Sequence, residues 1–379
     1  MILRQTGVMF VDAYRELNYK KLFWITMALS IIVVAVLACL GITDEGPTIF
    51  GWQMPFEIIS TRVIEKATFY KLLFFLVGFS IWLTWAATIL AIISTSSIIP
   101  DFVSSGSIEL SLSKPIGRLR LFLTKYLTGL TFVALQVAVF SLATFLVIGV
   151  RGSSWDPRVF WAIPLIVLFF SYLFAVSALA GLVTRSAVAA IIATALVWVA
   201  AWAVNSVEAG LLLQSRMERE MAVSLHETEI TKLQKDLATL PQTGGTEQQE
   251  NERKRLSGIL AEYEAGLAKV NESLATVKMW HSWTYGVAAI LPKTGATIEV
   301  LRTQLVRGSE IEKLVDNAPE PPPRMVNRLG AVRVSQKTLA KEHSKAVAGR
   351  SLGWVIGTSL AFEGVLLGAA ALLFCRRDF

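Results

Sequence analysis

The chain has little charge for its length and few of the side chains that build metal or thiol sites. Only 17% of its 379 residues are charged, and it contains three histidines and two cysteines. His226, His281 and His343 are far apart in the sequence, so a shared metal site would require an unusual fold. Cys39 and Cys375 are expected at opposite ends of their membrane spans, too far apart for a disulfide. We expect no metal site and no disulfide.

A nucleotide-binding loop is also missing. No Gly-x-x-x-x-Gly-Lys-Ser/Thr pattern occurs in the sequence, so the chain has no P-loop of its own for the phosphates of a nucleotide. His226-Glu227 is not followed by the second histidine that a helical zinc protease requires. We therefore expect no catalytic residues and no directly bound cofactor. Any ATP that drives this chain would be hydrolysed by a partner subunit.

Hydrophobic residues are abundant instead. They make up 54% of the chain, and its mean hydropathy is +0.54, well outside the range of a soluble domain. A helix needs about 20 apolar residues to cross roughly 30 Å of hydrocarbon. Six segments reach that length, namely 22–42, 72–94, 127–150, 159–184, 187–207 and 353–374. The sequence therefore predicts an all-α integral membrane protein with six transmembrane helices.

The positive charges favour cytoplasmic N- and C-termini. Four basic residues precede the first span and four lie between the second and third, and basic residues beside spans tend to stay in the cytoplasm. The basic segment before the last span favours the opposite direction, but charge along a long loop counts for little. The net charge of +7 is spread over loops beside the spans. We expect a multi-pass protein of a bacterial cytoplasmic (inner) membrane that contacts anionic lipids and not nucleic acid.

An extracytoplasmic insertion, residues 208–352, is expected between the fifth and sixth spans. Residues 209–278 carry two helical stripes separated by turn-forming residues that begin at Pro241. The second stripe alternates steps of four and three residues, which is typical of a coiled-coil seam. Its members are Leu256, Leu260, Tyr263, Leu267, Val270, Leu274 and Val277. We expect a coiled-coil helical hairpin with arms about 45 Å long, which offers a surface to an envelope protein.

The insertion leads back to the last span through an aromatic segment. Trp280, Trp283 and Tyr285 precede an apolar run, residues 286–291, that is too short to span a membrane. We expect this run to form a helix in the outer interface, where tryptophan and tyrosine are enriched. Residues 297–306 have the pattern of a further amphipathic helix.

Glu363 lies near the middle of the last predicted span. An ionised carboxylate that faced lipid there would cost on the order of 3 kcal/mol, so this side chain is expected to face protein or water. Two interpretations stay open. Glu363 either lines a transport route or packs between spans as a protonated or hydrogen-bonded residue.

The segment between the second and third spans carries the most specific pattern in the sequence. Residues 97–125 form a polar, proline-containing stretch between two apolar segments. The pattern consists of Gly106, Glu109, Leu110, Leu112, Pro115, Ile116, Arg118 and Lys125. Their order resembles the cytoplasmic loop of permease subunits in the type-two ABC exporter family, where this loop meets a separate ATPase subunit. The basic end of the chain after Phe374 is similar to the C-termini of such permeases.

The resemblance implies an ATP-driven exporter in which two permease subunits work with two ATPase subunits. The second permease is either another copy of this chain or a homologous permease. In this organisation residues 1–21 form an amphipathic or interfacial segment, 22–207 form five transmembrane helices with the docking loop 95–126, and 353–379 form the sixth helix and a basic C-terminus. Pro100-Asp101 and the long insertion depart from the family pattern. The substrate, whether a lipid, a peptide, an antibiotic or a factor for metalloenzyme maturation, stays open.

Two other classes of protein also stay open. A membrane-anchored coiled-coil scaffold would bind an envelope protein through the hairpin. An ion-coupled secondary transporter would use Glu363. The charges of the docking loop have an alternative role as anchors at the lipid surface. Co-purification with an ATPase separates the ABC permease from the other two classes.

Overall fold

The described chain forms two compact units. The computed structural model describes residues 21–53, 60–61, 64–104, 117–221, 226–241, 246–305 and 351–376. The unit that we call the bundle contains the described residues up to Trp202 together with 290–305 and 351–376. The unit that we call the insertion unit contains residues 203–221, 226–241 and 246–289.

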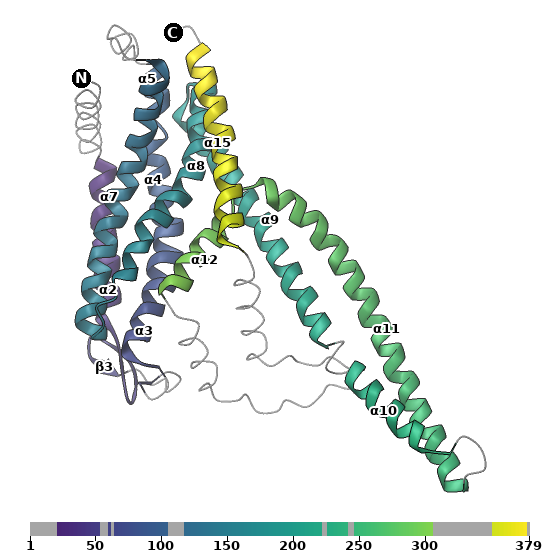
Figure 1. The fold of residues 1–379 in the computed structure, drawn as a ribbon. Helices are drawn as coiled ribbons and strands as arrows, with labels where there is room; N and C mark the ends of the chain where they lie inside the picture. Colours follow the sequence, from purple (N-terminus) through teal and green to yellow (C-terminus); the bar gives the residue numbers. More distant parts are fainter. Residues whose placement is uncertain are drawn as a thin grey trace. The chain divides into compact units, whose positions relative to one another are not determined.

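Six helices of the described chain are long and apolar enough to span a membrane, which confirms the predicted number. Four spans are single helices: α2 (Lys21–Cys39), α7 (Arg118–Gly152), α9 (Ala187–Met221) and α15 (Leu352–Arg376). The second span joins α3 (Lys66–Leu73), the π-helix η1 (Phe74–Ala87), α4 (Thr88–Thr95) and the short α5 (Ile98–Ser104). The fourth joins the 3-10 helix η2 (Pro157–Trp161) and α8 (Ala162–Thr184). Figure 1 shows their arrangement.

Several helices extend beyond the predicted span ends. The second span begins at Lys66 instead of residue 72, α7 begins at Arg118 instead of residue 127, and α9 continues to Met221. Lysine and arginine at a helix end can place their charge in the headgroup region, so the helix continues past the apolar residues. Pro100 lies in the first turn of α5, where a proline breaks no helical hydrogen bond.

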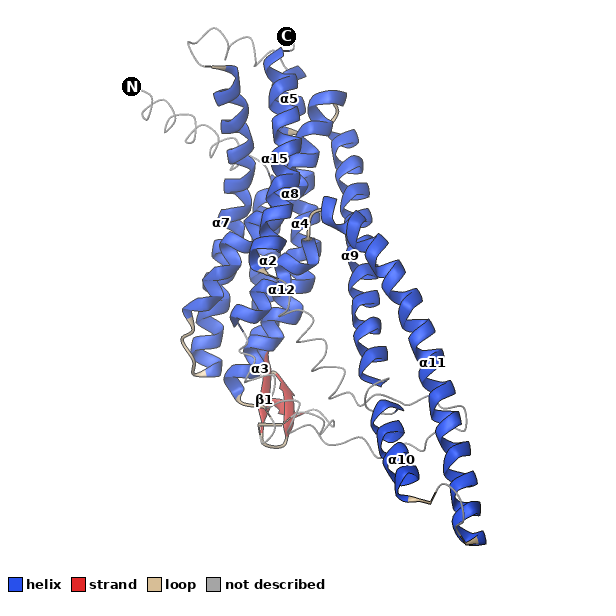
Figure 2. Cartoon of the chain, turned by 45° about the vertical axis from the view of Figure 1, so that its right-hand side comes forward, coloured by secondary structure: helices blue, strands red, loops and turns tan. Residues whose placement is uncertain are grey.

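Helix α8 is the centre of the bundle. It packs against α7, α12 and α15 (Figure 2), and Phe169, Phe170 and Phe174 are buried. Gly129 of α7 permits a close approach, because a Cβ atom there would lie 2.4 Å from the Phe174 ring. Lipid is as apolar as these side chains, so close packing and hydrogen bonds, and not removal from water, hold such helices together.

A small antiparallel sheet follows α2 and is absent from the sequence-based prediction. It consists of β1 (Leu40–Thr43), β2 (Gly46–Ile49) and β3 (Trp52–Gln53), in the order β1-β2-β3. The first span therefore ends at Cys39 and not at residue 42. Phe50 and Gly51 connect β2 to β3 with φ of 51° and 85°, which is the positive-φ pair of a type I′ turn. Only Gly51 fits the usual residue preference of this turn, so the sequence signal for the hairpin was weak.

Helix α12 (Thr294–Leu305) belongs to the bundle and not, as predicted from the sequence, to the insertion. The predicted amphipathic helix exists, and its apolar stripe of Ile298, Leu301 and Leu305 is buried, chiefly against α8. The helix predicted over 286–291 is present up to Ile290, but it is the end of a longer helix. Helix α11 (Glu247–Ile290) runs without a break through the aromatic segment, because no proline or glycine pair interrupts it before Pro292.

The insertion unit contains the end of α9, α10 (Thr228–Thr239) and α11. Glu208 meets His281 at 3.0 Å, and Ser273 donates to Glu218 at 3.1 Å. Further along, the ring of His226 contacts Tyr263, and Arg253 donates to the Pro241 carbonyl. Higher residue numbers along α9 and α10 pair with lower residue numbers along α11. The two sides of the insertion unit therefore run in opposite directions. The seam residues predicted on α11 are all buried or half-buried.

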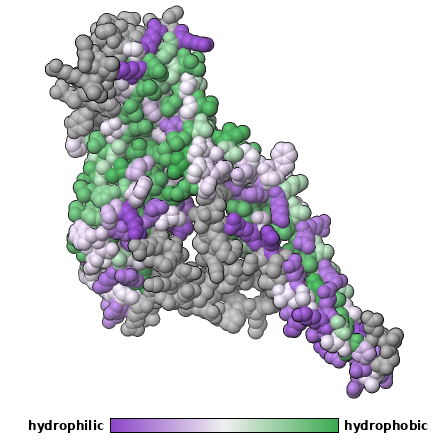
Figure 3. Space-filling model, viewed as in Figure 1, coloured by the Kyte–Doolittle hydropathy of each residue, from purple (hydrophilic) through white to green (hydrophobic). Residues whose placement is uncertain are grey.

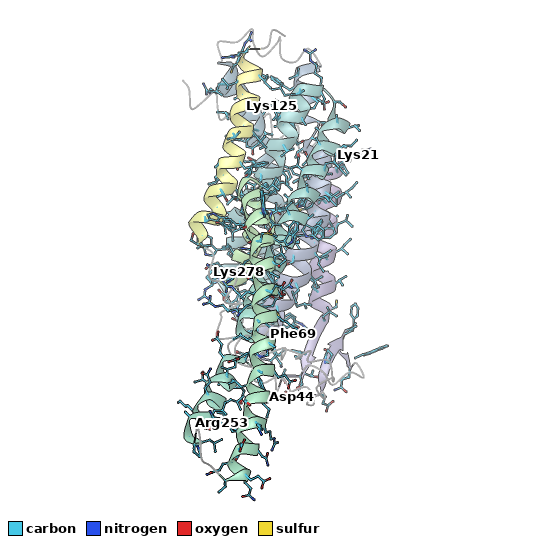
Figure 4. All side chains as sticks on the ribbon, turned by 90° about the vertical axis from the view of Figure 1, so that its right-hand side faces the viewer. Lys21, Asp44, Phe69, Lys125, Arg253 and Lys278 are labelled. Carbon is cyan, nitrogen blue, oxygen red and sulfur yellow. The ribbon has the colours of Figure 1, made fainter. Side chains whose placement is uncertain are left out.

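The two units differ in the character of their surfaces (Figure 3). The bundle carries a broad apolar band with polar residues toward its ends, while the surface of α10 and α11 is mainly polar with scattered apolar residues. In Figure 4, Lys21 and Lys125 lie toward one end of the bundle, and Asp44 and Phe69 lie toward the other. An apolar band between two polar ends is the pattern expected of a membrane-spanning unit.

Candidate functional site

Glu363 of α15 is buried in the bundle. Only 8% of this residue is exposed, and it lies near the middle of a helix that begins at Leu352 and ends at Arg376. From the sequence, this side chain is expected to face protein or water. It faces α7 and α8, where two hydroxyl groups meet its carboxylate oxygens.

The contacts of Glu363 join three helices. Tyr126 Oη of α7 donates to Glu363 Oε1 at 2.9 Å, and Ser171 Oγ of α8 donates to Oε2 at 2.8 Å. The same Tyr126 hydroxyl lies 2.8 Å from the carbonyl oxygen of Ser171, and Ser171 Oγ lies 2.8 Å from the carbonyl oxygen of Leu168. We call Glu363, Tyr126 and Ser171, with the adjacent Tyr172, the Glu363 cluster.

The surroundings of the Glu363 cluster are apolar and aromatic. The Tyr126 ring stacks on Phe174 with centroids 5.1 Å apart, and Phe170 stacks on Phe174 at 5.6 Å. Burying a carboxylate in such a place costs on the order of 3 kcal/mol, whereas a hydrogen bond to a charged group contributes about 1.5 to 3 kcal/mol. Two hydroxyl donors therefore offset the cost, and both interpretations of Glu363, packing and transport, are compatible with this burial.

Several buried polar atoms of α7 and α8 lack a hydrogen-bond partner within the described part of the chain. Tyr172 Oη is one of them, although the hydroxyl lies beside Thr297 of α12 and Ser359 of α15. Gln136 Nε2, Ser141 Oγ and Thr144 Oγ1 of α7 are others. Unpaired polar atoms are costly in an apolar interior, so their presence along α7 and α8 indicates a region suited to polar ligands or water.

The docking pattern is described only in part. Gly106, Glu109, Leu110, Leu112, Pro115 and Ile116 lie outside the described residues. Arg118 and Lys125 lie in the first turns of α7 and not in a loop. Arg118 Nη1 donates to the carbonyl oxygen of Cys375 at 3.2 Å, and Lys125 Nζ lies 5.4 Å from the centre of the Phe102 ring.

Aromatic rings connect both sides of the docking segment to the last turn of α15. Phe102 of α5 stacks on Phe374 with centroids 6.2 Å apart, and Phe122 of α7 lies 5.6 Å from the same ring. All three side chains are buried. The helices that flank residues 105–116 therefore rest on α15. At 1.5 Å per residue, Phe374 is about 16 Å along that helix from Glu363.

A second polar cluster lies at the other end of α7. Lys71 Nζ of α3 forms an ion pair with Asp156 Oδ2 at 3.0 Å, and the side chains are only 8% and 13% exposed. Burial raises the pKa of the Asp156 carboxyl, but the hydrogen bonds from Lys71 and the Arg158 backbone outweigh it and hold the pKa below its usual range. Tyr70 Oη donates to the Leu40 carbonyl and accepts from Arg151 Nε. These contacts fix α3, β1 and α7 to one another.

Glu363 could be identified from the sequence, but its hydrogen-bond partners could not. Tyr126 and Ser171 are single polar residues in apolar helices, and such residues were the available signal. Their pairing with Glu363 depends on which helices are neighbours, which hydropathy does not reveal. In the described part of the chain, no group of three or more His, Cys, Asp or Glu could hold a metal ion.

Comparisons with family models, with curated proteins and with solved structures found no match. The six apolar helices and the contacts of the bundle are therefore the observations from which a function is inferred.

Proposed function

We propose that this chain is the permease subunit of an ATP-driven exporter that resembles the type-two ABC family. It would move an unidentified substrate across a bacterial inner membrane with a separate ATPase subunit and a second permease subunit. The observation that carries the proposal is the contact of α15 with the helices on both sides of the docking segment, through Phe102, Phe122 and Arg118. A permease without a P-loop must receive force through such a contact.

The coupling follows from these contacts. Closure of the ATPase pair on ATP would push the docking segment, and α5 and α7 would transmit the push to Phe374 and Cys375 at the end of α15. Displacement of α15 would change the distances from Glu363 to Tyr126 and Ser171. Packed helices switch between discrete arrangements instead of deforming continuously, so a small shift at one end can open a polar route at mid-span.

The insertion unit supports a further part of this proposal. Its opposed helices, with the seam of α11 less exposed than its flanks, fit the coiled-coil hairpin that the heptad pattern predicts. With cytoplasmic termini and five preceding spans, the hairpin would lie outside the cytoplasm. There it would bind an envelope protein that receives or guides the substrate.

An ion-coupled secondary transporter is the second candidate. The observation that favours it is Glu363, which forms no ion pair with any arginine, lysine or histidine of the described chain. A scaffold role for the insertion unit is the third candidate. In a scaffold, the Glu363 cluster would only pack the helices together. Only the permease requires an ATPase.

The test is purification of the full chain with its partners from native membranes. We expect a P-loop ATPase to co-purify, and we expect Glu109→Ala with Arg118→Ala to reduce its recovery while expression and insertion stay normal. The matched control is Glu229→Ala with Lys232→Ala, which removes an exposed ion pair of α10. Equal ATPase recovery with the double variant and normal transport would refute the docking role, and absence of any ATPase would favour the second candidate.

A further inference from the structure

The Glu363 cluster has more acceptor oxygens than protons. The hydroxyls of Tyr126 and Ser171 each carry one proton, yet each lies within 2.9 Å of two acceptors. Two protons thus face four oxygens, which are both carboxylate oxygens of Glu363 and the carbonyl oxygens of Ser171 and Leu168. When Glu363 is ionised, its charge is shared by only these two hydroxyl protons, and a cation that joins the oxygens lowers the cost of burying that charge.

No side chain of the described chain supplies that positive charge. Glu363 has no ion-pair partner there. Lys125, the next residue to Tyr126, directs its ammonium group to the Phe102 ring. Lys293, whose backbone N–H donates to Ser359, directs its ammonium group to the Leu291 carbonyl and the Trp354 ring. The ammonium groups of these two lysines therefore act elsewhere.

The chemistry of the oxygens restricts the ligand. One carboxylate balances one positive charge, so a divalent ion would leave a net charge in the apolar bundle. The oxygens are hard donors, which favour hard cations over soft transition metals, and they lie within hydrogen-bond distance of one another, which favours a small ion. The hydroxyl of Tyr172, the fourth member of the cluster, is buried within electrostatic range of Glu363 and adds an oxygen that a shifted ion could use.

We propose that the Glu363 cluster is a binding site for a small monovalent metal cation of the sodium type, held by Glu363, Tyr126 and the Ser171 hydroxyl and carbonyl oxygens. This proposal rests on the proposed transport function, because it assigns a ligand to Glu363 on the transport route. Because the site joins α7, α8 and α15, bound sodium stabilises their present arrangement. Its release would accompany the displacement of α15.

The test measures sodium binding by the purified full-length chain in lipid nanodiscs. Thermal unfolding is followed in sodium, potassium, methylammonium or N-methyl-D-glucamine chloride at equal ionic strength. We expect sodium alone to raise the unfolding midpoint by a few degrees with saturation. Glu363→Gln should abolish this rise, and Tyr126→Phe should shift it to several-fold higher sodium concentration. Glu208→Gln is the matched control, because Glu208 is also buried but is paired with His281, and its sodium effect should equal that of the parent chain.

Binding of radioactive sodium to the same samples provides a readout that does not depend on unfolding. Saturable binding that Glu363→Gln removes would support the proposal. Equal midpoints in all four salts, or a sodium effect that survives Glu363→Gln, would overturn it. A shift with methylammonium alone would also overturn it and assign the site to an ammonium group of the cargo. None of these measurements needs the ATPase, so the sodium site and the ATP-driven function can fail independently.

Discussion

Helix α8 of the bundle and helix α11 of the insertion unit are both long, but different forces hold them. Phe169, Phe170 and Leu173 of α8 are buried on several sides by other spans. Along α11 the less exposed residues follow one stripe, and most of the others are exposed. In lipid the helices gain little from leaving their solvent, so fit between side chains decides stability. In water the apolar seam of α11 gains about 25 cal/mol per Å² of buried apolar surface.

This difference predicts opposite outcomes for the same substitution in the two helical environments. Gly129→Leu in α7 would drive atoms into the Phe174 ring, because even a Cβ atom at this position would lie 2.4 Å from that ring. We expect a loss of about 3 kcal/mol of stability, together with poor recovery of folded protein. Size-exclusion chromatography of detergent-solubilised protein and thermal unfolding would measure it.

The matched variant is Gly258→Leu in α11. No atom lies within 4 Å of a Cβ placed at Gly258, and leucine favours helix over glycine by roughly 0.8 kcal/mol. We expect this variant to fold as well as the parent chain or slightly better. Similar destabilisation by both variants would contradict the distinction between a packed and an exposed helix.

Helices α8 and α11 also differ in how much of their packing can be predicted from the sequence. The single stripe of α11 is visible as a heptad pattern because exposed and buried positions differ in polarity. Helix α8 is apolar all round, so its sequence predicts a span but not its central place or its neighbours. The partners of Glu363 were missed for that reason. The break at Cys39 was missed because Leu40, Gly41 and Ile42 continue an apolar run, while the hydrogen bond from Tyr70 to Leu40 that holds the strand comes from residues distant in sequence.

The bundle and the insertion unit also differ in how much their ion pairs contribute to stability. Lys71 and Asp156 of the bundle are largely buried, whereas Glu250 and Lys254 of α11 are 68% and 73% exposed. Exposed pairs contribute little because water and salt screen them. We expect Glu250→Gln to leave the unfolding midpoint unchanged and Asp156→Asn to lower it at neutral pH.

The Asp156 pair also predicts a dependence on pH. The pKa of Asp156 is lower in the folded chain than in the unfolded chain, where it is about 3.9. The stability that the charged form supplies is therefore complete above this value and is lost as the pH falls through it toward the folded pKa. Between neutral pH and about pH 3, the parent chain should lose more stability than Asp156→Asn. Parallel loss in both chains would show that Asp156 does not contribute.

Single cysteines at exposed positions should change stability least, and they test directly which side of the membrane the insertion unit faces. If the insertion unit lies outside the cytoplasm, a cysteine at Ser257, an exposed position of α11, should react with a membrane-impermeant thiol reagent in intact cells. Cys39 and Cys375, which are free, are first replaced by alanine. A cysteine at Thr184, exposed at the end of α8, serves as the opposite control and should react only after lysis. Reaction at Thr184 and protection at Ser257 would reverse the topology, and would place the hairpin on the same side of the membrane as ATP.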